Sequence, residues 1–136
     1  MSLLLDTCAA IWFADAAGLK KEAAEALDRA IEQKTPVHIS PITAWEIGML
    51  AAKGRVAWPI SPHAWFQRLT SREGIALAEL TPELLIKSSH LPGTPPPDPA
   101  DRIILATARD LELAVITRDR AILEYAEAGH VWAIGC

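Results

Sequence analysis

The sequence predicts an α/β fold in which one mostly parallel sheet of about five strands is covered by helices on both faces. Short apolar runs alternate along the chain with capped or amphipathic segments that are long enough to cross over a sheet. The chain has 136 residues, of which 51% are hydrophobic, so it is long enough for one domain with a sizeable core. We therefore expect a single domain over residues 1–136.

Five short apolar runs are predicted to be buried strands. They are Leu3–Leu5, Val37–Ile39, Ile75–Leu80, Leu113–Ile116 and Val131–Ile134. Parallel strands need long crossover connections, and the segments between most of these runs have the length and spacing of helices. The resulting alternation of strands and helices indicates the parallel sheet.

Helix starts are marked by a capping side chain followed by proline. This pair begins at Ser40, Ser61, Thr81 and Asp98. A further helix is predicted from Lys20 to about Lys34, because its apolar residues recur at helical spacing. The proline-rich segment from Leu91 to Pro97 is predicted to be a loop rather than a linker between domains.

Composition points to a cytoplasmic protein without a membrane segment. A charge interrupts every apolar run before it reaches the roughly 20 residues of a membrane span. The apolar start lacks a preceding basic residue and is broken by Asp6, which is atypical of a signal peptide. The two cysteines, Cys8 and Cys136, do not have the spacing of a disulfide framework or a zinc site.

Acidic residues occupy the positions where a parallel sheet binds its ligands. Asp6 follows the first predicted strand and Asp119 follows the fourth. Asp98 and Asp101 open the helix that leads into that fourth strand. Ligands of open α/β sheets bind beyond the carboxyl ends of the strands. Asp6, Asp98 and Asp119 could instead serve as helix caps, and Asp101 could be a first-turn carboxylate stabilised by the helix dipole, so both interpretations stay open at this point.

Glu46 is harder to explain structurally. Its helical neighbours include Ile42, Met49 and Leu50, so its carboxylate stands in a mainly apolar stripe. Burial of an unpaired charge is costly, and such a group must pair, take up a proton or bind a cation. Asp101, with apolar residues one turn further on, raises the same question.

A divalent cation is the natural counter-charge for a cluster of Asp6, Glu46, Asp101 and Asp119. Carboxylate ligands without His or Cys suit Mg²⁺ or Mn²⁺, which also accept phosphate oxygens. Such a site would hydrolyse phosphodiester bonds with metal-activated water. Without the cation, the crowded carboxylates should repel one another, and some of their pKa values should be raised.

Four segments resemble, in order and at similar spacing, the motifs of VapC-type PIN-domain toxins of type II toxin–antitoxin systems. They are Leu4–Thr7, Ser40–Ile47, Asp98–Ala106 and Ile116–Asp119. The resemblance covers nearly the whole chain and implies a PIN-like endoribonuclease that forms homodimers and is silenced by a small antitoxin covering the pocket. It implies catalytic and metal-binding roles for one acidic set, supported by Asp98 and Thr117. That set is Asp6, Glu46, Asp101 and Asp119.

The formal net charge of −4 gives no overall attraction to RNA, so a substrate needs local positive charge. Arg102, Arg118 and Arg120 flank the predicted ligands and are predicted to meet the RNA backbone. Their alternative role is that of solvated surface charges. Among the five tryptophans, Trp58 is the one expected to face a partner, because it precedes a proline in a predicted loop.

Three other functions remain open. A phosphatase with Asp6 as nucleophile would need a second aspartate two residues later, where Cys8 stands. A non-catalytic α/β binding module would not require acids in apolar stripes. A DNA nuclease of related architecture would have additional DNA-clamping segments. The four histidines are scattered without ligand spacing, which favours metal-activated water over histidine acid–base catalysis.

Overall fold

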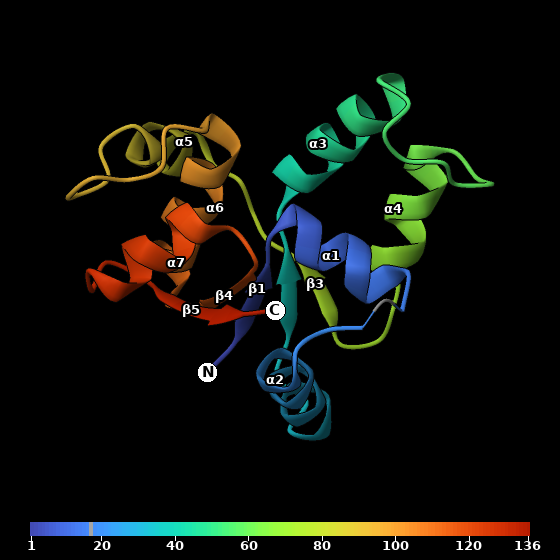
Figure 1. Ribbon diagram of the computed structural model, residues 1–136, viewed down its shortest axis with the longest axis horizontal. Coiled ribbons are helices and arrows are strands. Elements are labelled where there is room, and N and C mark those ends of the chain that lie inside the picture. Colours follow the sequence, from blue (N-terminus) through green and yellow to red (C-terminus); the bar gives the residue numbers. More distant parts are fainter. Residues whose placement is uncertain (17) are drawn as a thin grey trace.

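Five short strands form one parallel sheet in the order β3-β2-β1-β4-β5 (Figure 1). The computed structural model describes residues 1–16 and 18–136. The strands are β1 (Leu3–Leu5), β2 (Val37–Ile39), β3 (Ile75–Leu77), β4 (Ala114–Thr117) and β5 (Trp132–Gly135). Helices cover both faces of the sheet (Figure 1). The predicted α/β fold class is confirmed.

The first strand lies at the centre of the sheet. Leu3 pairs with Val37 of β2 on one side and with Ala114 of β4 on the other. The chain builds outward from β1 to β3 and then returns to place β4 against the free side of β1. The strand order therefore reverses between β1 and β4, which is where open α/β sheets form their ligand crevice.

The described residues form seven helices. They are α1 (Thr7–Ala14), α2 (Lys21–Glu32), α3 (Pro41–Ala52), α4 (Pro62–Thr70), α5 (Pro82–Ser88), α6 (Pro99–Leu111) and α7 (Arg120–Glu127). The four predicted cap-and-proline starts are confirmed, because each capping side chain accepts a hydrogen bond from an amide of the first turn. Each cap fixes the residue at which its helix begins. It thereby fixes the positions of Glu46 on α3 and Asp101 on α6.

Alternation along β1 divides its leucines between two hydrophobic cores. Leu3 and Leu5 pack with α1, α2 and α4 on one face of the sheet. Leu4 packs with Ile104 of α6 and Ile122 of α7 on the other. All three leucines are buried, as expected for a central parallel strand. The end of β1, where Asp6 stands, is therefore held from both faces.

The third predicted strand is longer than the observed one. It ends at Leu77 instead of Leu80, because β2 ends at Ile39 and offers no partner beyond the bond from the Ala78 amide to the Ile39 carbonyl (2.8 Å). Trp58 is half-buried and stacks on Trp65, with ring centroids 4.4 Å apart; that it faces a partner stays a prediction.

No helix in the described part of the chain combines the length and the apolar character that a membrane crossing requires.

Candidate active site

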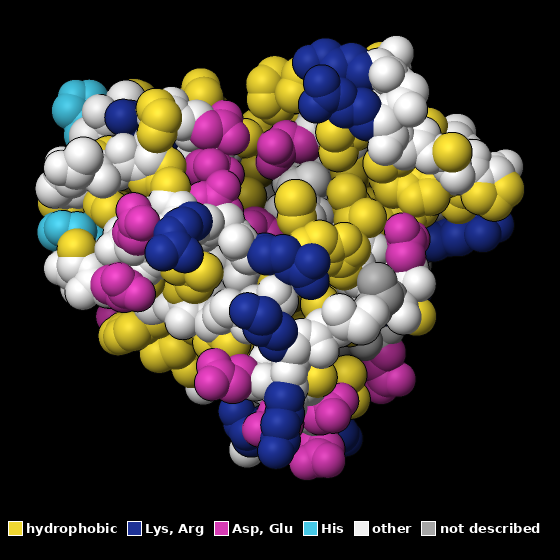
Figure 2. Space-filling model, viewed as in Figure 1, with side chains coloured by type: hydrophobic (Ala, Val, Ile, Leu, Met, Phe, Trp, Pro, Cys, Tyr) yellow, Lys and Arg dark blue, Asp and Glu magenta, His cyan; other side chains and the backbone are white. Residues whose placement is uncertain are grey.

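A cavity of about 350 Å³ opens at the carboxyl ends of β1 and β4, bordered by α1, α3 and α6. Acidic side chains gather in the hollow between α3 and α6, with hydrophobic side chains beside them (Figure 2). The cavity is lined by Asp6, Thr7, Cys8, Trp12, Glu46, Asp98, Asp101, Arg118 and Asp119. The structure thus brings together the four predicted acidic residues and Asp98.

Asp6 and Asp119 are linked through one threonine hydroxyl. The Thr117 Oγ1 donates to Asp6 Oδ2 and accepts a hydrogen bond from the Asp119 amide (2.9 Å). The other oxygen of Asp6 accepts from the Ala9 amide (2.8 Å) and caps α1. The Asp6 cap predicted as an alternative is therefore present, and it holds the buried carboxylate in one orientation beside β4.

Glu46 is held by a second hydroxyl network. The Thr7 Oγ1 donates to Glu46 Oε1 (2.5 Å), and the Thr7 and Thr43 hydroxyls lie 3.1 Å apart. Since Thr7 gives its proton to Glu46, it accepts the proton of Thr43. Thr43 lies one turn before Glu46 on α3, so α1 and α3 together orient the glutamate.

Asp98 and Asp101 enter the cavity from the first turn of α6. Asp98 caps this helix by accepting from the Ala100 amide (3.2 Å). Asp101 lies within the first turn, where the helix dipole favours a negative charge. Asp119 caps α7 in the same manner through the Ile122 amide (3.0 Å). Three of the acids are therefore caps as well as lining residues of the cavity.

The pKa values of three cavity carboxyls are raised, as the crowding predicts, but burial is the leading cause. Burial raises the pKa of Asp6, which hydrogen bonds from Thr117 and Ala9 partly offset. Burial raises the pKa of Glu46 as well, against the opposing hydrogen bond from Thr7. Burial, and then the negative charges of Asp98 and its neighbours, raise the pKa of Asp101 to about 7.

The donor chemistry of the cavity fits a hard divalent cation. Its carboxylates offer oxygen ligands of the kind that Mg²⁺ and Mn²⁺ prefer, and five acidic side chains line the cavity together with one basic side chain, Arg118. In the side-chain conformations of residues 1–16 and 18–136, no three His, Cys, Asp or Glu side chains are close enough together to coordinate one ion. Hydrogen bonds from Thr117 and Thr7 hold one carboxylate oxygen of Asp6 and one of Glu46. The carboxylate groups would therefore have to rotate for these residues to bind the same ion.

The three predicted RNA-binding arginines have different surroundings. Arg118 lines the cavity, with its guanidinium carbon 3.0 Å from the centroid of the Trp12 ring and its Nε donating to the Cys136 carbonyl (3.0 Å). Arg120 is exposed and forms an ion pair with Glu124. Arg102 donates from Nε to the Pro96 carbonyl (2.8 Å), outside the cavity lining.

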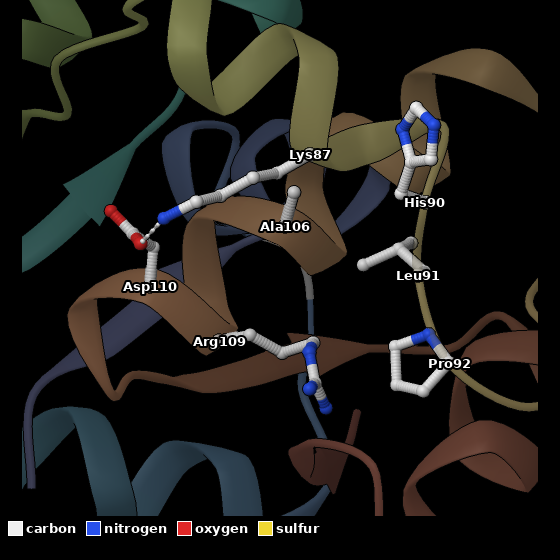
Figure 3. Close-up of a pocket in the computed structure, with 7 residues that line it drawn as sticks. All are labelled: Lys87, His90, Leu91, Pro92, Ala106, Arg109 and Asp110. Atoms are coloured by element: carbon white, nitrogen blue, oxygen red, sulfur yellow. Dashed lines mark hydrogen bonds and ion pairs between the residues drawn. The ribbon is translucent and has the colours of Figure 1, made fainter.

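A second cavity, of about 290 Å³, lies between α5 and α6 (Figure 3). Its Lys87 ammonium is 2.8 Å from Asp110 and 3.4 Å from Glu83. Its Arg109 donates to the His130 carbonyl. These cations already have partners, so this cavity has less to offer a charged ligand than the acidic one.

Two contributors to the site were not predicted as functional residues. Thr7 and Thr43 carry the hydrogen bonds that orient Glu46. Thr7 directly follows Asp6, and Thr43 precedes Glu46 by three residues, so the helical spacing was the available signal. Cys8 and Trp12 also line the cavity. Cys8 is exposed at its surface, but partial desolvation of the thiol and the nearby charges of Asp6 and Glu46 raise its pKa to about 11, which makes it a poor nucleophile.

Comparison with known proteins agrees with this geometry. The PIN domain family model matches residues 3–128. Ribonuclease VapC22 of Mycobacterium tuberculosis is 31% identical over 122 residues, covering 89% of either chain.

Solved structures give the same fold. VapBC2 from Rickettsia felis, bound to a DNA fragment from its promoter, aligns with a TM-score of 0.70 at 11% identity over 99% of this chain and 98% of that one. A toxin–antitoxin complex from Klebsiella pneumoniae aligns with a TM-score of 0.62 at 25% identity, covering 97% and 95% of the two chains. With its acids at the ends of β1 and β4 and a family match over almost its full length, the chain belongs to the PIN-domain family.

Proposed function

We propose that this protein is a divalent-metal-dependent endoribonuclease that acts as the toxin of a toxin–antitoxin pair, with the acidic cavity as its active site. The proposal depends on one observation above all: Asp6, Glu46 and Asp101 line a single cavity and all have raised pKa values. The relative named as a ribonuclease and the fold neighbours named as toxin–antitoxin complexes support this choice of activity. We take residues 1–136 as one nuclease domain.

Four carboxylates are the proposed ligands of Mg²⁺ or Mn²⁺: Asp6, Glu46, Asp101 and Asp119. When bound, the cation would supply positive charge for a phosphate oxygen and lower the pKa of a water molecule. Thr117 keeps Asp6 and Asp119 in a fixed relation, and Asp98 supports the set from the start of α6. Without the cation, the Asp101 carboxyl holds a proton for about half of the time at neutral pH, because its pKa is about 7.

Arg118 is the strongest candidate for contact with the RNA backbone. Contact with the Trp12 ring and a hydrogen bond to the Cys136 carbonyl hold its side chain at the cavity, while its terminal nitrogens can donate to a phosphate. Arg120 directly follows Asp119 and is exposed. It is proposed to contact the RNA backbone farther from the cavity than Arg118 does. Arg102, the third predicted contact, already donates from Nε to the Pro96 carbonyl and stands outside the cavity lining, so it is the weakest candidate of the three.

Two protein partners are proposed. A small antitoxin would place an Arg or Lys side chain in the cavity, where it meets the unbalanced carboxylates and excludes the phosphate. A second copy of the chain would form a homodimer, for which α5 and α6 offer exposed apolar side chains at Leu85, Ile86 and Leu111. The RNA substrate and the antitoxin would both be met in the cytoplasm, in keeping with two free cysteines.

Cleavage of single-stranded RNA by the purified protein tests the proposal. We expect cleavage with Mg²⁺ or Mn²⁺, none in EDTA, and products with 5′-phosphate and 3′-hydroxyl ends. Cleavage that persists in EDTA or leaves 2′,3′-cyclic phosphate would contradict metal-activated water. Turnover of small phosphate esters without RNA cleavage would indicate the phosphatase, cleavage of DNA alone the DNA nuclease, and RNA binding without cleavage the binding module.

Calorimetry tests the cation separately from the substrate. Binding of Mn²⁺ near pH 7 should release protons, because Asp101 must lose its proton to become a ligand. The number released should fall at pH 8.5, where Asp101 is already ionised. Mn²⁺ binding without proton release at pH 7 would indicate that Asp101 is not a ligand.

A further inference from the structure

The segment Leu91–Pro97, here called the proline strap, connects α5 to α6 and ends immediately before Asp98. It contains four prolines: Pro92, Pro95, Pro96 and Pro97. Proline has no amide hydrogen, so four of the seven residues of the strap have no backbone donor, including all three that directly precede Asp98. Its position depends on groups elsewhere that donate to its carbonyls or pack against it.

Three side chains fasten the proline strap. The Tyr125 hydroxyl donates to the Pro92 carbonyl (2.5 Å). The His130 ring lies so close to Gly93, whose φ is +67°, that a Cβ there would collide with the ring. The Arg102 Nε donates to the carbonyl of Pro96 (2.8 Å), which is a buried residue. This bond is partly buried, and Pro96 itself is buried, so the Arg102 side chain satisfies a carbonyl that has restricted access to water.

The Arg102 side chain connects the proline strap to the first turn of α6. It donates to the Pro96 carbonyl, while the Arg102 backbone amide makes the ordinary first helical bond to the Asp98 carbonyl (3.1 Å). Asp98 in turn lines the cavity, and its charge is the largest electrostatic contribution to the raised pKa of Asp101. The guanidinium therefore stands outside the cavity lining and is bonded to the strap two residues before Asp98, at the start of the helix that carries both carboxylates.

We propose that Arg102 is a positioning residue, which holds the proline strap and thereby sets Asp98 and Asp101 in place for the divalent cation. The inference rests on the proposed function, since it takes those two residues as part of a metal site. It assigns to Arg102 a role different from contact with RNA. The two roles predict different losses, because a phosphate contact acts on substrate affinity whereas a positioning residue acts on the cation.

The experiment compares Arg102→Gln and Arg102→Lys with the parent protein. For Arg102→Gln we expect Mn²⁺ affinity, measured by calorimetry without RNA, to fall about tenfold, the scale of residues that orient metal ligands. The turnover number should fall with it at fixed Mn²⁺, while KM for RNA and its salt dependence stay within about twofold. Hydrogen exchange of the first-turn amides of α6 should accelerate. Arg102→Lys should recover most of these losses, because its ammonium can reach the same carbonyl.

Two further variants keep the proposal testable if Arg102→Gln folds poorly. Tyr125→Phe removes only the hydroxyl at the other end of the proline strap, and should weaken Mn²⁺ binding in the same direction but less. Arg29→Gln removes an equal charge from the exposed face of α2, at the opposite end of the sheet, and should change none of these quantities (Figure 1). A melting curve for each variant separates loss of fold from loss of metal.

The outcomes separate the inference from the proposed function. A raised KM with a weaker salt dependence and unchanged Mn²⁺ affinity would overturn the inference and make Arg102 a phosphate contact. Unchanged exchange and unchanged Mn²⁺ affinity would also overturn it. If the parent protein binds Mn²⁺ without cleaving RNA, the proposed function fails, while Mn²⁺ affinity and amide exchange still decide the role of Arg102.

Discussion

Helix α6 contributes to two cavities that are similar in size but differ in how far their charges are balanced. At its first turn, Asp98 and Asp101 face a cavity of about 350 Å³ in which acids outnumber the one lining arginine. Further along, Arg109 and Asp110 line a cavity of about 290 Å³ in which Lys87 pairs with Asp110 at 2.8 Å. The difference teaches that unbalanced charge, more than volume, distinguishes a candidate site from a surface hollow.

The largest effect should come from removing a carboxylate in the first cavity. Asp6→Asn keeps the shape of the side chain and its cap on α1, but removes one of the proposed ligand charges. We expect RNA cleavage to fall by at least about 100-fold, since even residues that only orient metal ligands cost about 10- to 100-fold. Initial rates at saturating Mg²⁺ measure this loss.

Asp110→Asn is the matched control in the second cavity. It is an equal change on the same helix as Asp101, and cleavage should stay within about twofold of the parent rate. If Asp6→Asn and Asp110→Asn lowered the cleavage rate equally, the first cavity could not be distinguished from the second as the active site.

The next effect concerns stability and has an unusual sign. Asp101 has a pKa of about 7 in the folded protein, above its ordinary value of 3.8, so the fold loses stability as pH rises between these two values, and the loss is complete above pH 7. Asp101→Asn should therefore raise the free energy of unfolding by about 1–2 kcal/mol at pH 8 in EDTA, after allowance for partial exposure and for lost helix-dipole stabilisation. The gain should shrink as pH falls through 7 and disappear near pH 4.

Urea unfolding at pH 8, 6.5 and 4.5 checks this dependence. Asp28→Asn, an exposed change on α2, provides the control and should leave the pH dependence as it is. Added Mn²⁺ should stabilise the parent protein and narrow its difference from Asp101→Asn. If Asp101→Asn lowered the free energy of unfolding at pH 8, the ionised carboxylate would have a net stabilising effect on the fold, contrary to the prediction.

A smaller effect is expected from the threonine that orients Glu46. Thr7→Val keeps the volume of the buried side chain and removes the hydroxyl that donates to Glu46 Oε1. Cleavage and Mn²⁺ affinity should fall about tenfold, at the lower end of the range for residues behind metal ligands. Thr7→Ser, which retains the hydroxyl, should remain near the parent values. A Thr7→Val protein with full Mn²⁺ affinity would show that Glu46 needs no such partner.

The smallest effect should come from the ion pair of the second cavity. Lys87 and Asp110 are both substantially exposed, so Asp110→Asn should lower the free energy of unfolding only slightly. Salt near 1 M should remove even this difference, because it screens exposed charges. Thermal melts in low and high salt make the measurement. If Asp110→Asn lowered the free energy of unfolding strongly, and by the same amount in 1 M salt, the charges of the second cavity would matter as much as those of the first.

Much of the fold could be predicted because its signals are local. Ser40, Ser61, Thr81 and Asp98 carry their cap and proline within two residues, and each begins a helix. The strands were located as short apolar runs, whereas the end of β3 was not, because it depends on where the neighbouring β2 stops. The stacking of Trp58 on Trp65 likewise depends on how a loop folds back onto α4.

The residues of the candidate site also differ in whether local sequence or tertiary packing determines their positions. Its carboxylates could be placed at the ends of strands by a rule about parallel sheets. Their hydroxyl partners could not, because the contact of Thr7 with Glu46 depends on how α1 packs beside α3. The direction of Arg102 was equally hidden, since it depends on the path of the proline strap. Sequence alone also gave repulsion as the cause of the raised pKa values, where burial is the larger one.

The central place of β1 also sets the order in which the cavity forms during synthesis. Asp6 leaves the ribosome 111 residues before its partner Thr117, and Asp119 follows Thr117 by two. The strand beside β1 that carries this partner is β4, so one side of β1 has no neighbouring strand until β4 has been made. Until then a nascent chain holds Asp6 and Glu46 without the other half of the cavity, and the proposed nuclease activity cannot begin before β4 pairs with β1.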